Sequence, residues 1–225
     1  MIWSTFGESL PAAVGIAISP LPVVLVILML VSARAKVNGP AFLVGWIVGV
    51  SIVVTAAFLL ADAADAATDS TTADTVDWMQ LVVGVLFFAL AARQWRKRPQ
   101  PGTEPATPKL FSTVDSMNAL SALGLGVAAC IANPKNLPLG ISAGATMAAS
   151  GIHGSDAVWA IVLFVIVASA TVGVPVAVFF VMGSRAEAVL SAWKSWLTLN
   201  NATVMMVLFA VLGARSLGTG LGVLA

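Results

Sequence analysis

Charged residues are scarce in this sequence, and their scarcity excludes most classes of soluble protein. Asp, Glu, Lys and Arg make up only 9% of the 225 residues, whereas a soluble domain contains about 25%. The formal net charge of +1 lacks the basic surplus with which a nucleic-acid-binding protein contacts phosphates. Hydrophobic residues make up 59% of the chain. This composition is typical of a membrane protein.

Cysteine and histidine occur once each, which excludes further chemistries. A single cysteine, Cys130, can form neither an internal disulfide nor a relay between two thiols. One histidine and no paired carboxylates inside the apolar runs provide no metal-ligand set and no acid–base pair. We therefore expect no metal, no cofactor and no enzyme. The sequence has no P-loop motif, so any transport would draw on gradients.

Long apolar runs dominate the sequence, and about 20 such residues cross the hydrocarbon core of a bilayer. The predicted fold class is an all-α polytopic membrane protein with six transmembrane helices. The predicted spans are residues 9–33, 40–62, 77–95, 117–149, 156–182 and 198–216. Gly45 and Gly49 in the second span predict a helix-packing face, and residues 38–40 predict a turn.

Polar segments between the spans carry further predictions. Residues 62–77 hold five aspartates and no Lys or Arg, a pattern that favours a solvated loop over a cation trap. Residues 189–197 place apolar side chains at helical spacing among charged ones, which is typical of a short helix in the membrane interface. Asp156 is expected to cap the fifth span.

The distribution of positive charge predicts the orientation. In a six-span arrangement, nine of the eleven Lys and Arg residues lie on one side. Loops rich in these residues stay in the cytoplasm. We therefore predict a multi-pass protein of the plasma membrane with both termini on the outer side.

Two short motifs interrupt the apolar runs at matching places. Residues 19–22 (Ser-Pro-Leu-Pro) lie in the first span and residues 133–136 (Asn-Pro-Lys-Asn) in the fourth. Residues 85–93 in the third span likewise resemble residues 207–215 in the sixth. A three-span unit that is repeated once has to be inverted in the membrane, as in many secondary transporters. The sequence therefore predicts two inverted three-helix repeats with broken helices 1 and 4.

The repeat also predicts the organisation of the chain. Residues 1–95 would form the first three-helix repeat, residues 96–116 a cytoplasmic linker rich in proline and basic residues, and residues 117–225 the second repeat. Trp46 and Trp159 fall near matching positions in the second and fifth spans. The linker composition gives little support for regular structure.

Both motifs are expected to start a new half-helix at mid-membrane. Ser or Asn followed by Pro is typical of a helix N-cap and first turn, so we predict helix starts at Pro20 and Pro134. Inversion would bring the two amino ends together, each with unpaired N–H groups and roughly half a positive charge. Lys135, in the first turn of its half-helix, would add a third positive element.

This centre predicts a binding site for an anion such as a carboxylate, phosphate or sulfate. The candidate substrate-binding residues are Ser19, Pro20, Pro22, Asn133, Pro134, Lys135 and Asn136, and the candidate pathway residues are Ser142 and Thr146. An alternative is that the prolines are only kinks and that Lys135 snorkels or pairs with a backbone carbonyl. Ser142 and Thr146 could equally hydrogen-bond to their own helix.

The two Pro motifs and the six-span pattern resemble the lysine-exporter superfamily. Within it, they are most similar to the actinobacterial GAP/Sap group, which is named for addressing glycopeptidolipids and sulfolipids to the cell surface. The resemblance covers about residues 9–215. It implies export of an anionic envelope glycolipid, or of a similar small anionic molecule, across the plasma membrane by alternating access.

Two other functions stay open at this point. One is an accessory or scaffold protein that assists a larger lipid exporter, and the other is an amino-acid exporter of the lysine-exporter type. The expected partners are membrane lipids and an anionic substrate, with no nucleic acid. A homodimer and a complex with a larger exporter both remain compatible with the small-residue helix faces.

Overall fold

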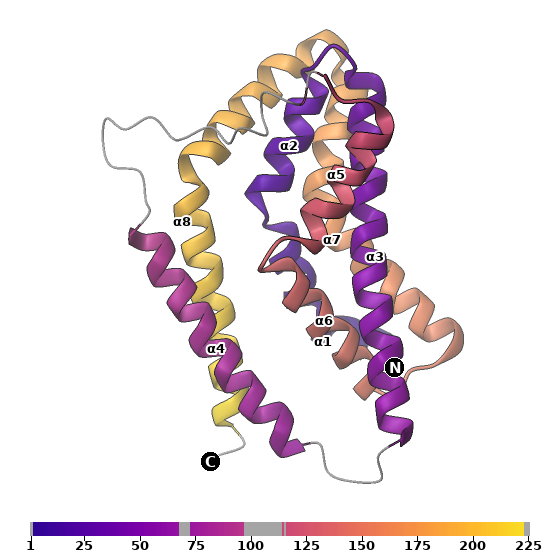
Figure 1. The fold of residues 1–225 in the computed structure, drawn as a ribbon, viewed down its shortest axis with the longest axis vertical. Helices are drawn as coiled ribbons and strands as arrows, with labels where there is room; N and C mark the ends of the chain where they lie inside the picture. Colours follow the sequence, from indigo (N-terminus) through magenta and orange to yellow (C-terminus); the bar gives the residue numbers. More distant parts are fainter. Residues whose placement is uncertain (1, 68–72, 97–113, 115, 223–225) are drawn as a thin grey trace. The chain divides into compact units, whose positions relative to one another are not determined.

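The computed structural model describes residues 2–67, 73–96, 114 and 116–222 of the chain. These residues form helices joined by short turns and contain no strand (Figure 1). The all-α prediction is therefore confirmed. Most of the predicted linker, residues 96–116, lies outside the described residues.

The chain divides into two compact units. Unit 1 comprises Met1–Ala67 and Thr107–Leu197, and unit 2 comprises Thr68–Ala106 and Thr198–Ala225. Unit 1 contains α1 (Ile2–Ala17), α2 (Pro20–Leu30), α3 (Ala35–Ala67), α5 (Ala119–Ile131), α6 (Asn136–Ala149), α7 (Gly154–Met182) and the 3-10 helix η2 (Gly183–Arg185). Unit 2 contains α4 (Ala73–Arg96) and the later part of α8 (Ala186–Leu221), which begins in unit 1.

Unit 1 is built around α3, which packs against α2, α5, α6 and α7. The helix α1 packs against α6 and α7. Large apolar side chains from several of these helices are fully buried, among them Phe42, Trp46, Met29 and Phe164. Figure 1 shows α2 and α5 along one half of α3, and α6 along the other half.

Glycines allow α3 to approach its neighbours at backbone distance. A Cβ atom on Gly45 would lie 2.0 Å from the carbonyl oxygen of Leu123, and one on Gly126 would lie 2.2 Å from that of Phe42. A Cβ atom on Gly144 of α6 would lie 2.6 Å from the Val54 carbonyl oxygen. Close backbone approach at small residues is the usual packing mode inside membranes. The packing role predicted for Gly45 is therefore confirmed.

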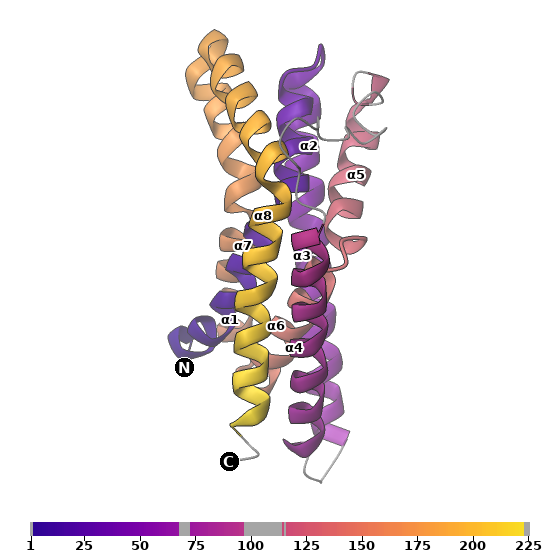
Figure 2. The ribbon, with the colours of Figure 1, turned by 90° about the vertical axis from the view of Figure 1, so that its left-hand side faces the viewer.

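In unit 2, α4 and the later part of α8 lie side by side (Figure 2). The rings of Phe87 and Phe209 stack with their centroids 5.9 Å apart and an interplanar angle of 21°. The Leu217 side chain of α8 lies close to Gly84 of α4, and the Phe88 ring of α4 lies close to Gly213 of α8. An aromatic stack at a small-residue crossing thus joins the two helices.

Length and composition identify fewer spans than the six predicted. Ala35–Ala63 and the stretch Gly154–Gly218 are apolar and long enough to cross a membrane, and α1 with α2, bent by 54°, would make a third span. The second stretch contains the end of α7 at Gly183, whose φ of 55° stops a helix. The apolar helices support a membrane protein with two or three candidate spans, while the six-span inverted repeat stays a prediction.

The structure corrects two predicted connections. Residues 38–40 form no turn, because α3 already begins at Ala35 and the Asn38 N–H donates to the Arg34 carbonyl oxygen at 2.9 Å. Pro40 is accommodated inside the helix, at a loss of one N–H donor. The acidic loop at 62–77 is also shorter than predicted, since α3 continues to Ala67 and α4 starts at Ala73.

Two further predictions about α7 and α8 are wrong. Residues 189–197 form no separate helix, because α8 continues without a break from Ala186 to Leu221. Asp156 lies in the first turn of α7, where the N-cap position belongs to His153. Trp46 is fully buried and Trp159 is largely exposed; their near-matching positions in the two halves stay a prediction.

The glycine contacts predict opposite effects for two neighbouring alanine substitutions in α5. Gly126→Ala should destabilise the protein by about 1–3 kcal/mol, because the new methyl group forces α3 and α5 apart. Gly124→Ala, with nothing within 4 Å of its Cβ position, should be neutral or stabilise by up to about 1 kcal/mol through helix propensity. Unfolding in detergent micelles measures both changes. Equal effects of the two substitutions would contradict the proposed helix contact.

Candidate functional site

The first helix break lies between α1 and α2, at Ile18 and Ser19. Pro20 has no N–H, and the Ser19 N–H donates to the Ala17 carbonyl oxygen at 2.7 Å instead of continuing the helix. Ser19 then takes an extended conformation as the N-cap of α2, which starts at Pro20. The helix start predicted at Pro20 is confirmed.

The second break lies between α5 and α6 and is organised by Asn133. The Asn133 side-chain oxygen accepts a hydrogen bond from the Lys135 N–H at 3.1 Å. Its backbone oxygen accepts from the N–H groups of Asn136 at 3.1 Å and Leu137 at 3.3 Å. Because of this turn, the new helix α6 begins only at Asn136. The helix start predicted at Pro134 is therefore wrong by two residues.

The two breaks meet inside unit 1. The Ser19 hydroxyl lies 3.4 Å from the Asn136 side-chain oxygen, to which it donates. The Asn133 side-chain amide nitrogen lies 3.5 Å from the same hydroxyl. Although 114 residues separate Ser19 from Asn133 in the sequence, the amino ends of α2 and α6 thus lie next to each other. We call Ser19, Asn133, Lys135 and Asn136 the break cluster.

Lys135 is the charged centre of the break cluster, and its side chain is fully buried. Its ammonium group donates to the carbonyl oxygens of Gly15 and, at 2.8 Å, Ile18. Both carbonyls belong to the carboxyl end of α1, where the helix dipole attracts a cation. The structure therefore shows the alternative in which Lys135 pairs with backbone carbonyls.

This geometry corrects the role expected for Lys135 in the first turn of a half-helix. The residue directly precedes α6, and its ammonium group turns away from the positive amino ends toward α1. The N–H groups of Asn136, Leu137 and Leu139 already donate to backbone oxygens of residues 133 and 135. In this conformation the N–H groups of these three residues at the amino end of α6 are therefore already hydrogen-bonded within their own segment of chain.

An unsatisfied polar atom nevertheless remains in the break cluster. The Asn136 side-chain nitrogen is buried without a hydrogen-bond partner in the described part of the chain. A buried donor without an acceptor costs about 1–3 kcal/mol. The break cluster therefore holds donor capacity that another group could use.

Thr171 of α7 also belongs to the site, although the sequence interpretation did not include it. Its hydroxyl donates to the Ala17 carbonyl oxygen. That bond lies in the same last turn of α1 that binds Lys135. A hydroxyl in an otherwise apolar span was the available signal. Such residues usually bond within their own helix, so nothing in the sequence singles Thr171 out.

The remaining predicted site residues differ in their surroundings. Pro20 and Pro22 are buried at the start of α2, while Pro134 is exposed. Ser142 is exposed on α6, and Thr146 is half-buried. The Thr146 backbone oxygen accepts a hydrogen bond from the Ser150 hydroxyl at 2.9 Å. The pathway role of Ser142 and Thr146 stays a prediction.

A comparison with protein families gives one informative finding. The family model described as "Sap, sulfolipid-1-addressing protein" matches residues 10–222. The matched region includes both helix breaks and all residues of the break cluster. Neither the curated proteins nor the solved structures provide a match.

The contacts of Lys135 predict a large loss of stability on removing its ammonium group. Lys135→Met should destabilise the protein by about 2–4 kcal/mol, because two buried carbonyl oxygens lose their donor. Lys36→Met is the matched control, since Lys36 is exposed at the start of α3. Denaturant titration in micelles compares the two. Similar small losses for both variants would contradict a structural role for the buried ammonium group.

Proposed function

This chain belongs to the sulfolipid-1-addressing protein (Sap) family, and we propose that it exports an anionic envelope lipid, or a similar small anion, across the plasma membrane. Membership of this family supports a role in lipid transport. The observation that carries the finer proposal is the buried break cluster, in which two interrupted helices meet around Lys135. Interrupted helices that meet at mid-membrane are typical of secondary transporter sites.

In the proposed mechanism, the anion and the α1 carbonyls compete for the Lys135 ammonium group. A buried ammonium bound only by carbonyl dipoles lacks a full counter-charge, and a sulfate, phosphate or carboxylate would supply one. The unpartnered Asn136 side-chain nitrogen offers the anion a further donor. Transfer of Lys135 from carbonyls to anion would release the end of α1, and this release would favour the change between inward- and outward-open states.

Contacts between equivalent residues support the inverted repeat within this proposal. Ser19 and Asn133 hold matching positions of the two motifs, and their side chains meet at 3.5 Å. Phe87 and Phe209 hold matching positions of residues 85–93 and 207–215, and their rings stack. Equivalent residues touch each other where a two-fold axis passes between them. Both contacts are those expected for two inverted three-helix repeats.

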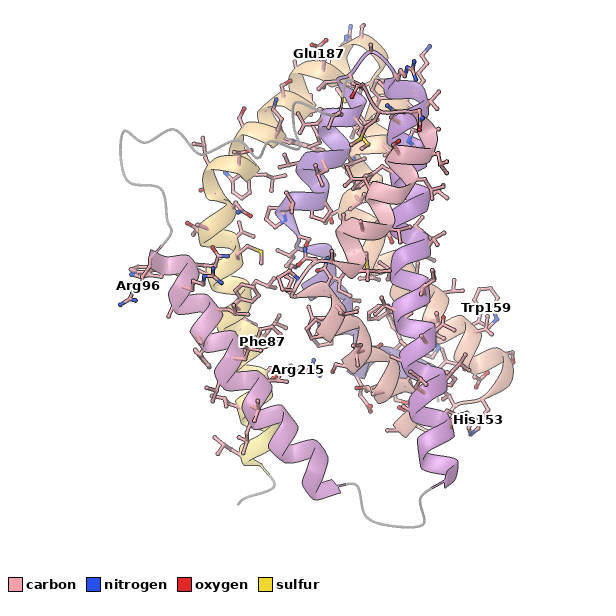
Figure 3. All side chains as sticks on the ribbon, in the orientation of Figure 1. Phe87, Arg96, His153, Trp159, Glu187 and Arg215 are labelled. Atoms are coloured by element: carbon pink, nitrogen blue, oxygen red, sulfur yellow. The ribbon has the colours of Figure 1, made fainter. Side chains whose placement is uncertain are left out.

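The distribution of charge in unit 1 supports the proposed orientation. Arg34 and Lys36 flank the α2–α3 connection, and Arg185 lies in η2. Figure 3 shows Glu187, next to η2, at one end of unit 1 and His153 at the other. At that second end His153 lies 3.5 Å from the Asp62 carboxylate. Under the positive-inside rule the first end faces the cytoplasm.

The proposal predicts transport of a sulfated lipid by the purified protein alone. Proteoliposomes should translocate fluorescently labelled sulfatide, measured by chemical quenching of the exposed label, but not its unsulfated parent galactosylceramide. Lys135→Gln should lower the rate about tenfold or more, because it removes a charge-assisted hydrogen bond. The control variant Lys36→Gln should translocate sulfatide at the rate of the unaltered protein.

Two other results would redirect this proposal. Equal movement of both lipids, or of sulfatide by both lysine variants, would contradict an anion site at Lys135. A stable complex with a larger lipid exporter, together with no translocation by the protein alone, would favour the accessory function.

The orientation has its own test in intact spheroplasts. In a Cys130→Ala background, a membrane-impermeant maleimide should label His153→Cys at once, and Lys36→Cys only after lysis. Both side chains are exposed in the structure, so accessibility to the reagent depends on the side of the membrane. The Cys130→Ala protein without a new cysteine serves as the blank. Labelling of Lys36→Cys alone would reverse the proposed orientation.

A further inference from the structure

The carboxyl end of α1 exposes more carbonyl oxygens than its own chain can satisfy. In a continuous helix the Gly15 carbonyl would accept from the Ser19 N–H, and the Ile18 carbonyl from residue 22. The Ser19 N–H donates to Ala17 instead, and Pro22 has no N–H to donate. Gly15 and Ile18 are thus left with free carbonyl oxygens beside the break.

The oxygen atoms at this helix end resemble the ligand set of a monovalent cation. The ammonium group of Lys135 binds Gly15 and Ile18, and the Thr171 hydroxyl lies against the carbonyl of Ala17, between them in the chain. Half-helix carboxyl ends and unwound carbonyls coordinate Na⁺ in other transporters. No group of three or more His, Cys, Asp or Glu side chains occurs in the described residues, and a divalent ion prefers such carboxylates.

We infer that the carbonyl oxygens of Gly15 and Ile18, at the carboxyl end of α1, form a Na⁺ site that the Lys135 ammonium group occupies as a tethered cation in this conformation, and that the Thr171 hydroxyl supports this site through the neighbouring Ala17 carbonyl. When the ammonium group leaves, the buried carbonyls again need a positive partner. A free Na⁺ ion then takes its place, because it carries the same charge and prefers oxygen ligands.

This site deepens the proposed function, on which the following consequence rests. The anion and Na⁺ both favour the state in which Lys135 has left α1. Each should therefore raise the affinity of the protein for the other, by the same factor. Na⁺ binding by itself involves no lipid, so the cation site can be tested apart from transport.

The test is a Na⁺-dependent change in thermal stability after the tethered cation has been removed. Lys135→Ala protein in micelles should unfold about 4 °C higher in roughly 200 mM NaCl than in choline chloride, as expected for a ligand well above its dissociation constant. KCl should give a smaller rise. The wild-type protein, whose ammonium group fills the site, should unfold at the same temperature in all three salts.

A second substitution locates the ion. Adding Thr171→Val to Lys135→Ala removes the hydroxyl oxygen at nearly constant volume and should abolish most of the Na⁺ effect. Thr171→Ser keeps the hydroxyl and should preserve it. Binding of radioactive ²²Na⁺ to Lys135→Ala, displaced by unlabelled NaCl but not by choline chloride, provides a direct readout.

Several results would overturn the cation site. They are a folded Lys135→Ala protein with no Na⁺-specific stabilisation, a Na⁺ effect that is unchanged by Thr171→Val, and a variant that aggregates in NaCl as well as in choline chloride. In the last case Na⁺ would not replace the ammonium group. If the Na⁺ effect is present but the wild-type protein moves no sulfatide, the cation site stands and the proposed transport of sulfated lipid fails.

Discussion

The buried hydrogen bonds between the Lys135 ammonium group and the carboxyl end of α1 are the interaction on which the break depends. A helix interrupted at membrane depth leaves backbone carbonyls without donors, and no water is available in the hydrocarbon to supply them. An ammonium group buried alone would be just as unfavourable. The ammonium group provides the donors that the carbonyls need, and the carbonyls provide its acceptors, so the broken helix and the buried charge are stable only together.

The packing of α3 makes this arrangement possible. Gly45, Gly126 and Gly144 bring α3 within backbone contact of α5 and α6, and this contact holds α5 and α6 against one continuous helix on both sides of their break. The helix α1 is held in turn by α6 and α7. Lys135 therefore reaches α1 from a fixed position, and the polar centre is enclosed by a closely packed apolar shell.

In the transporter that we propose, the buried centre of this conformation corresponds to a state without bound substrate. The N–H groups at the start of α6 already have acceptors, and Lys135 already has carbonyl partners. In the proposed mechanism an arriving anion replaces these bonds, and a ligand with several strong acceptor oxygens gains most from the exchange. Sulfated and phosphorylated headgroups have such oxygens, in agreement with the family to which the chain belongs.

The sequence by itself determined the helical class, the membrane environment and the places where α1–α2 and α5–α6 are interrupted, because each follows from local composition or from a proline without an N–H. It also indicated that residues 19 and 133 would meet. The tertiary structure decided where the Lys135 ammonium group points and that Thr171 joins the site. Those features depend on which donor reaches which free carbonyl across 117 to 154 residues of chain, and local preferences carry no information on such distant hydrogen bonds.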